Sequence, residues 1–294
     1  MRKKIPLVIA IIAACLVGNG FAATAAETNA TAPAPLKLCV ATFNLRFASN
    51  TRPNSWAERR PVMRECVRQL APDLLGTQEG LHHQLKDLAA DLPGYDWIGT
   101  VRDGGDQGEF MAVFFRRERF TALATNHFWL SDTPEVVASS TWGNSNRRMV
   151  TCIRFREKAS GREFHFWNTH FDHQVETARR KSAQLVRERV DALKTDLPVL
   201  LTGDFNCAAG TSHAHHTLVR DGGFTDTWAV AKSRVNETYN SFNSFGTPRQ
   251  EGVRIDWILV RGKATVDRSE IVTFSKDGQY PSDHFPVVAW LTLP

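Results

Sequence analysis

A short apolar run at residues 199–201 leads into two side chains that can carry out chemistry, Asp204 and Asn206. Such a run is typical of a buried strand, and α/β proteins bind ligands where strands end. If the strand stays extended, Asp204 and Asn206 point the same way and Phe205 turns into the core. One acid and one neutral amide can then share a metal-bound phosphate or an activated water. The same residues are also typical of a strand ending in an Asx turn, so the other strand ends must decide.

Polar side chains recur at the ends of other predicted strands. In sequence order these residues are Asn44, Glu79, Glu109, Arg148, His170, Asp204, Asn206, Asp256, Asp283 and His284. Carboxylates and amides with no cysteine among them favour Mg²⁺, Mn²⁺ or Ca²⁺ over zinc. Two histidines with carboxylates available as partners indicate acid–base work or contact with a phosphate. Together the set predicts metal-assisted attack of water on a phosphate ester.

The spacing of apolar residues predicts the elements that must hold these side chains. Helices are predicted at residues 56–70, 81–92 and 175–193, and a shorter one near 212–220. Strands are predicted at residues 36–45, 73–79, 95–101, 110–116, 120–130, 148–155, 163–169, 199–206, 253–260, 271–274 and 285–291. This succession predicts an α/β fold, a four-layer α/β sandwich of two packed mixed β-sheets with outer helices. One cleft would then collect the strand-end residues.

The first 26 residues are typical of a secretory signal peptide. Positive residues 2–4 precede an apolar run at 5–17 that is too short for a stable membrane span. Cys15 resembles a lipoprotein site, but Leu16 and Val17 continue the apolar run past it, which favours cleavage near residues 23–26. Residues 27–35, rich in Ala, Thr and Pro, predict a linker. A folded domain is therefore expected at 36–294, in a secreted or periplasmic protein whose mature chain has no transmembrane segment.

Net charge limits the class of partner. The chain carries a net charge of +5, and loss of the cations Arg2, Lys3 and Lys4 with the signal peptide lowers it to +2. So mild a charge weakens the case for a nucleic-acid partner. Arginine clusters such as Arg59 and Arg60 are interpreted mostly as solvated faces, with substrate contact as the alternative. No stable protein partner is implied, and a monomer is expected.

Four cysteines remain beyond the signal peptide, and their pairing is left open. An exported protein could pair them, yet Cys39 and Cys152 lie in apolar runs where a lone thiol packs as a small hydrophobe. The other two are Cys66 and Cys207. No cysteine–histidine zinc spacing is present, and the additional histidines at 82–83 and 213–216 match no metal-ligand motif.

Seven motifs in order give the chain a family resemblance. They are TFNLR (42–46), TQE (77–79), GEFMAVFF (108–115), NTHFDH (168–173), GDFN (203–206), RIDWILV (254–260) and SDHFPVVA (282–289). With these motifs the sequence closely resembles the endonuclease/exonuclease/phosphatase superfamily, which includes deoxyribonuclease I and exonuclease III. The resemblance covers the whole predicted domain and implies a divalent-metal-dependent hydrolase acting on phosphate ester bonds, with Mg²⁺ or Mn²⁺ as cofactor.

The resemblance also implies roles for the acidic and amide residues. Glu79 matches the family's metal-binding glutamate, and Asn44 matches its neighbour on the first strand. Asp283 matches the carboxylate near the metal and the water. Asp204 and Asn206 match the pair that positions the attacking water and the phosphate.

The histidines and their partners are assigned in the same way. His284 resembles the terminal histidine that contacts the scissile phosphate and is held by Asp256. His170 resembles the second catalytic histidine, and Glu109 falls where some nucleases place the acidic partner of that histidine. Arg148 falls where an arginine reaches the phosphate in those members.

The substrate stays open at this level. A phosphodiester or a phosphomonoester fits the motifs, in a small molecule or in DNA or RNA, and a nuclease would need a basic groove with aromatic stacking. A catalytically inactive binding module of the same fold is the alternative from another class, and the complete set of site residues argues against it. Asp172 and His173 either shape the pocket or cap the long helix.

Overall fold

The computed structural model describes Met1 and residues 34–294. The described residues 34–294 form one compact unit by their contacts, and its first strand begins at Leu36. Residues 2–33 lie outside the described residues. They include the predicted signal peptide after Met1, with Cys15, and all of the predicted linker except its last two residues. In the described part of the chain, no helix is both long enough and apolar enough to span a bilayer.

Two mixed β-sheets form the centre of the domain. The first sheet has the order β10 (Ser233–Val235), β12 (Thr265–Ile271), β13 (Val287–Leu293), β1 (Leu36–Asn44), β2 (Leu74–Leu81), β4 (Glu109–Arg116), β3 (Tyr95–Val101). The second sheet has the order β5 (Phe120–Trp129), β6 (Met149–Glu157), β7 (Glu163–His170), β8 (Val199–Asp204), β11 (Asp256–Arg261), β9 (Thr225–Asp226). Strand pairs β1–β2, β7–β8 and β10–β12 are parallel, and the other pairs are antiparallel.

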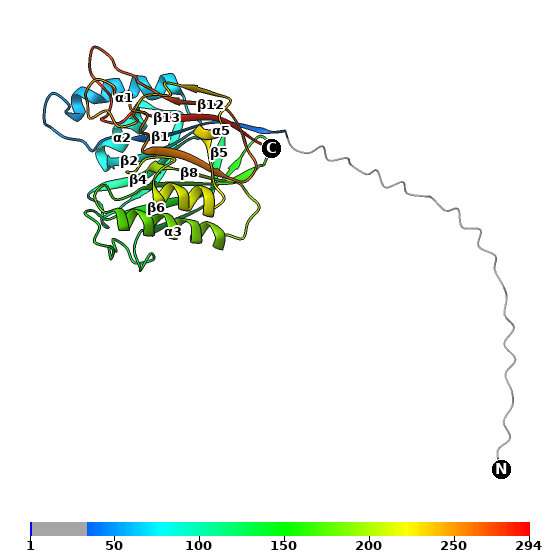
Figure 1. The fold of residues 1–294 in the computed structure, drawn as a ribbon. Coiled ribbons are helices and arrows are strands. Elements are labelled where there is room, and N and C mark those ends of the chain that lie inside the picture. Colours follow the sequence, from blue (N-terminus) through cyan, green and yellow to red (C-terminus); the bar gives the residue numbers. More distant parts are fainter. Residues whose placement is uncertain (2–33) are drawn as a thin grey trace, which may run out of the picture. The chain divides into compact units, whose positions relative to one another are not determined.

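Helices cover the outer faces of the two sheets (Figure 1). Helices α1 (Trp56–Leu70) and α2 (His82–Asp91) pack against the first sheet, and α3 (Glu176–Ala192) packs against the second. A third apolar cluster fills the space between the sheets. The fold is therefore the predicted four-layer α/β sandwich. Three shorter helical segments complete it, α4 (His213–His216), η1 (Thr217–Asp221) and α5 (Thr227–Val230).

Close approach of the two sheets sets the geometry beneath the cleft. Gly76 in β2 faces Thr202 in β8, and a Cβ at this glycine would overlap the threonine Oγ1. Only glycine allows the sheets to come this close. Asn168 in β7 ties them together, since its Nδ2 donates to the carbonyl oxygens of Thr77 (2.8 Å) and Ala112 (3.0 Å) in the first sheet. The sheets are thus locked together two or three residues from the polar strand ends.

The last quarter of the chain departs from the predicted elements. A strand was expected at residues 271–274, but β12 spans Thr265–Ile271, so that prediction is wrong. Its register shifts between Val266 and Arg268, and this bulge breaks the period-two alternation that would have marked the strand. The strand predicted from residue 253 begins only at Asp256, and the one predicted from 285 begins at Val287.

Candidate active site

Strand ends from both sheets meet at one edge of the sandwich. In the second sheet, β7 and β8 are parallel, and His170 lies in register with Asp204. Strand β11 is antiparallel to β8, so its first residue, Asp256, also lies opposite Asp204. In the first sheet, β1 ends at Asn44 beside β2, which carries Glu79 near its end. Parallel neighbours and an antiparallel start therefore deliver acids, an amide and an imidazole to the same place.

A cleft of about 350 Å³ opens over this edge. Eight of the ten predicted site residues line it: Glu79, Glu109, Arg148, His170, Asp204, Asn206, Asp283 and His284. The other two, Asn44 and Asp256, are fully buried and contact the lining residues from behind. The structure thus brings the whole predicted set together.

The backbone after β8 turns rather than staying extended. Strand β8 ends at Asp204, and Asn206 has a left-handed backbone (φ 51°). Its N–H donates to Asp204 Oδ1 (2.9 Å), which is an Asx turn. Phe205 does turn into the core, where its ring stacks on Trp257 with centroids 4.1 Å apart. The extended alternation expected beyond Asp204 is therefore wrong, but the turn still holds both polar side chains at the cleft.

Asp204 lies at the centre of the cluster. Its Oδ2 accepts a hydrogen bond from Asn44 Nδ2 (3.0 Å) and lies 3.4 Å from His170 Nε2 and 3.7 Å from His284 Nε2. Burial and the neighbouring charge of Asp256 raise the pKa of Asp204 to about 7. A carboxylate with that pKa is suited to accept a proton at neutral pH.

His284 is held as a cation. Its Nδ1 lies 3.0 Å from Asp256 Oδ2, which orients the ring so that Nε2 faces Asp204. Burial alone would lower the pKa of His284, but the charges of Asp256, Asp204 and Asp283 outweigh it and raise that pKa to about 10. At neutral pH the ring therefore carries a proton on each nitrogen and can donate toward the cleft.

His170 is held neutral. Burial and the charges of Arg148 and Arg102 lower the pKa of His170 well below its usual value. Asn206 Nδ2 lies 2.9 Å from His170 Nε2 and also donates to Phe171 O (3.1 Å), which sets the amide orientation. His170 Nε2 is then the acceptor, so its proton lies on Nδ1, which has no hydrogen-bond partner in the described part of the chain.

Glu79 and Asn44 form the hydrogen-bonded pair expected at a cation site. Asn44 Nδ2 donates to Glu79 Oε1 (2.9 Å) as well as to Asp204. Burial acts to raise the pKa of Glu79, but the Asn44 hydrogen bond and the charges of His284 and Arg46 lower it overall. Glu79 is therefore ionised at neutral pH and available as a ligand.

Asp283 completes this side of the cleft. Burial raises the pKa of Asp283, and Ser282 Oγ lies 3.3 Å from its Oδ1. The Arg46 guanidinium bridges the two carboxylates, with nitrogens 3.7 Å from Glu79 and 3.6 Å from Asp283. One arginine thus offsets part of the negative charge of both acids.

Two overlapping residue groups have ligand atoms close enough to share a metal ion. Each group keeps its ligand atoms within 4.8 Å of one another: Glu79, His170 and Asp204 in one, and Asp204, Asp256 and His284 in the other. The protonated His284 cannot act as a ligand, whereas the first group offers two carboxylates and a neutral imidazole. Carboxylate oxygens such as those of Glu79 and Asp204 suit a hard divalent cation. The donor set therefore fits Mg²⁺ or Mn²⁺.

Glu109 is placed differently from its predicted role. It forms an ion pair with Arg102, whose Nη1 lies 2.5 Å and Nη2 2.9 Å from the two carboxylate oxygens. The two residues face each other across the β3–β4 hairpin, where Arg102 N donates to Glu109 O (2.9 Å). Burial raises the pKa of Glu109 to about 7 despite Arg102. The expected contact with His170 is not present, because the nearer arginine takes the carboxylate.

Arg148 lies in the cleft wall as expected. It is 3% exposed, and its Nη2 lies 3.1 Å from His173 Nδ1. Its Nε and Nη1 have no hydrogen-bond partner in the described part of the chain. Burial and the charge of Arg102 lower the pKa of Arg148 to about 10, so it stays charged at neutral pH. A buried guanidinium with free N–H groups is suited to bind an anion.

Asp172 and His173 fulfil both alternatives between them. Asp172 is fully buried, and its Oδ1 accepts from the backbone N–H groups of Gln174 and Val175 just before α3. Its Oδ2 accepts from Ser145, which ties the loop before β6 to the site. His173 lines the cleft.

Five further residues line the cleft without having been assigned to it: Arg46, Phe47, Arg102, Asn146 and Phe242. The TFNLR motif contains Arg46, so its place after Asn44 was a usable signal. Arg102 and Phe242 had no such sequence signal. Arg102 follows strand β3 at a hairpin, and Phe242 lies in an irregular segment after β10.

The other histidines and the cysteines have structural surroundings. His215 is buried, and its Nε2 lies 3.0 Å from Asp226 Oδ2 on the outer side of the second sheet. The four cysteines of the described residues are free thiols, so no two of them form a disulfide.

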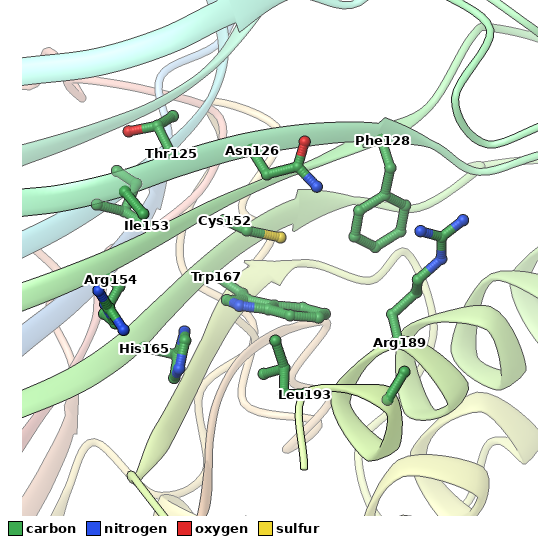
Figure 2. A pocket seen from close by; sticks show the side chains of 12 residues that line it. Thr125, Asn126, Phe128, Cys152, Ile153, Arg154, His165, Trp167, Arg189 and Leu193 are labelled. Carbon is green, nitrogen blue, oxygen red and sulfur yellow. The ribbon is translucent and has the colours of Figure 1, made fainter. Parts of the chain in front are cut away.

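A second cavity, of about 470 Å³, lies on the outer face of the second sheet beside α3 (Figure 2). Phe128, Cys152 and Trp167 project from neighbouring strands, and Arg189 and Leu193 approach from the helix side. It is larger than the cleft, but its lining contains no carboxylate. It therefore lacks the ligands for a hard cation and is not a candidate for the chemistry.

Comparison with known proteins agrees with the geometry. Residues 41–284 match the model of the endonuclease/exonuclease/phosphatase family. A solved family protein from Bacteroides thetaiotaomicron is 36% identical, with a TM-score of 0.83 over 89% of this chain and 97% of that one. A mannosyl-6-phosphatase from the same organism is 38% identical, with a TM-score of 0.78 over 86% and 99%.

A curated relative, an uncharacterised protein of Acanthamoeba polyphaga mimivirus, is 30% identical over 160 residues, which make up 51% of this chain and 59% of the relative. The family model, by contrast, spans nearly all the elements that build the cleft. The chain therefore belongs to the endonuclease/exonuclease/phosphatase family.

Proposed function

We propose that this chain is a divalent-metal-dependent phosphoesterase that hydrolyses small phosphate monoesters, with a sugar phosphate as the preferred substrate. The observation that carries the proposal is the pairing, in one cleft, of a buried base, Asp204, with a buried imidazolium, His284. A cleft of about 350 Å³ is of the size that takes a small molecule. The solved relative described as a mannosyl-6-phosphatase supports a sugar as the leaving group.

Mg²⁺ or Mn²⁺ is the proposed cofactor. Glu79 and Asp283 would hold it, with Asn44 fixing the Glu79 carboxylate by a hydrogen bond and Arg46 bridging the two acids. When bound, the cation polarises a phosphoryl oxygen as a Lewis acid.

The chain's own residues supply the remaining steps of the proposed reaction. Asp204 accepts the proton of the attacking water, which its raised pKa favours at neutral pH. As the new P–O bond forms, the P–O bond to the sugar breaks, the departing oxygen takes a proton from solvent, and Asp204 returns its proton to solvent. His284 donates a hydrogen bond to a phosphoryl oxygen, where negative charge accumulates in the transition state. The unpartnered N–H groups of Arg148 bind another oxygen of the phosphate.

We expect kcat/KM to rise with pH through about 7. Asp204 must be ionised to accept a proton, and below its pKa of about 7 it is protonated, so the rate should fall about tenfold per pH unit on the acid side. The pH–rate profile of the wild type gives the measurement. Glu109 also has a pKa raised to about 7, so Glu109→Gln is the control and should leave the acid limb in place. Loss of the limb in Glu109→Gln would transfer the assignment from Asp204 to Glu109.

A substrate panel tests the proposed function. The purified protein with Mg²⁺ or Mn²⁺ is assayed against sugar phosphates, a phosphodiester chromogen, sphingomyelin, plasmid DNA and RNA, with Asp204→Asn as the inactive control. Fastest turnover of sugar phosphates supports the proposal. Preferential cleavage of DNA or RNA would make the chain a nuclease, and no turnover of any compound would favour an inactive binding module of the same fold.

The proposal includes export to the periplasm or the medium, supported by the sequence of residues 1–26 alone. Mass spectrometry of the amino terminus tests it. A lipid on an amino-terminal Cys15 would contradict free export and would show that the protein is anchored to the membrane.

A further inference from the structure

Arg59 in helix α1 is fully buried, although the sequence placed it in a solvated arginine cluster. Each of its nitrogens donates to a backbone carbonyl oxygen. The acceptors are Asn54 (3.0 Å, from Nε), Leu45 (2.8 Å) and Pro281 (2.9 Å, both from Nη1), and Arg46 (3.0 Å) and Phe47 (3.1 Å, both from Nη2). All five N–H donors of the guanidinium are therefore used. Burial lowers the pKa of Arg59 to about 10, so it stays charged at neutral pH.

Four of the five acceptors, all except Asn54, belong to the two segments that carry the proposed cation ligands. Residues 45–47 directly follow Asn44, and Pro281 precedes Asp283 by two residues. One nitrogen, Nη1, donates to a carbonyl in each segment and so links them directly. All four hydrogen bonds of the two Nη atoms go to these segments, so the buried guanidinium holds their backbone in one arrangement.

The β-sheet does not supply this link. Strands β1 and β13 pair only as far as Thr42 and Val287, so the ladder ends before the chain reaches Asn44 on one side and Asp283 on the other. Beyond the last paired residues of β1 and β13, hydrogen bonds from Arg59 and Ser282 link the two segments. Ser282 Oγ donates to Asn44 O (2.7 Å).

A second side chain supports the same loop. Gln84 of α2 is fully buried, and its Nε2 donates to Arg46 O (2.9 Å). It reaches only the 45–47 segment, whereas Arg59 reaches both segments. Arg59 is therefore the side chain on which the separation of the two segments depends most.

We infer that Arg59 is a positioning residue that sets the affinity of the site for a divalent cation. By fixing residues 45–47 against Pro281, it fixes the distance between Asn44, with its partner Glu79, and Asp283. The inference rests on the proposed function, because it takes these residues as the cation site.

Mn²⁺ binding, followed by electron paramagnetic resonance, tests the inference without relying on turnover. Arg59→Met keeps the length of the side chain and removes every donor, and it should raise the Mn²⁺ dissociation constant about 10- to 100-fold, as loss of a residue that orients metal ligands does. Arg59→Lys keeps the charge but not the fork of donors, so it should remain at least about fivefold weaker than the wild type.

Met63→Ala is the matched control. Met63 is fully buried in the same helix, one turn after Arg59, and its truncation destabilises the packing of α1 without removing a hydrogen bond to either segment. Its Mn²⁺ affinity should stay within about twofold of the wild type. Equal losses in Met63→Ala and Arg59→Met, or full affinity in Arg59→Lys, would overturn the inference.

Ser282→Ala keeps the test open if Arg59→Met does not fold. It removes the other hydrogen bond between the same segments and should also weaken Mn²⁺ binding. If Arg59→Met does not fold, unchanged Mn²⁺ affinity in Ser282→Ala, or in Arg59→Lys, would overturn the inference. Failure of the proposed function is separate: a wild type that binds Mn²⁺ but turns over no phosphate ester contradicts the function alone. A wild type that binds no Mn²⁺ contradicts both.

Discussion

Asp256→Asn and His284→Ala are each expected to lower kcat by about 100- to 1000-fold, and the double variant should be little worse than the worse single one. Asp256 is fully buried, and its contact with the cleft runs through the 3.0 Å hydrogen bond to His284 Nδ1. It acts by orienting the ring and by keeping it protonated against the effect of burial. Once the ring is gone, the carboxylate has nothing left to orient.

A double-mutant cycle on kcat measures this coupling. Multiplicative loss in the double variant would show that the two residues act independently and would contradict the assignment. The chain offers a matched control pair, His215 in α4 and Asp226 in β9, with the same 3.0 Å separation, both buried but outside the cleft. Asp226→Asn and His215→Ala should lower the stability of the fold while leaving kcat within about threefold of the wild type.

Removal of divalent cations with EDTA should abolish turnover. Glu79, Asp204 and Asp283 bring three carboxylates to the cleft that must receive an anionic phosphate, and Arg46 offsets only part of their charge. Without a cation, the ionised acids repel the substrate by several kcal/mol, on the order expected for like charges a few ångströms apart at low dielectric.

Activity after chelation and after re-addition of each metal gives the measurement. Excess Mg²⁺ or Mn²⁺ should restore the full rate, and circular dichroism before and after EDTA serves as the control for folding. Turnover that survives exhaustive chelation and does not respond to added Mg²⁺ would contradict the mechanism, whatever the substrate is. Recovery with Zn²⁺ but not with Mg²⁺ would contradict the reading of the ligands as a hard oxygen set.

Local patterns predicted much of the secondary structure, because each of those elements is marked by residues close together in sequence. Helix α1 occupies the predicted residues 56–70, and the reason is local: Glu58 accepts from Ser55 N (3.1 Å) and Oγ (2.6 Å) at its start. The strand β12 was misplaced because a bulge hides its alternation, and a bulge is defined by pairing with β13 rather than by the strand's own residues.

The site, too, has a part that the sequence predicted and a part that it did not. Asn44, His170 and Asp204 could be named from sequence because each ends a strand, and strand ends gather at one edge once the sheets form. The partner of each side chain could not be predicted from sequence. Glu109 was expected beside His170, but the β3–β4 hairpin places it opposite Arg102, and these two residues form an ion pair.

Sequence by itself determined the fold class, the family and ten residues of the site, because these depend on residue types at spacings that the chain carries along its length. Tertiary structure alone decided their protonation and the role of Arg59. The neutral His170, the cationic His284 and the raised pKa of Asp204 arise from burial and from charges brought in by other strands. Arg59 has the same sequence context as its neighbour Arg60, which is half-buried and pairs with Asp87 and Asp91, and only the packing of α1 against two loops turns Arg59 inward.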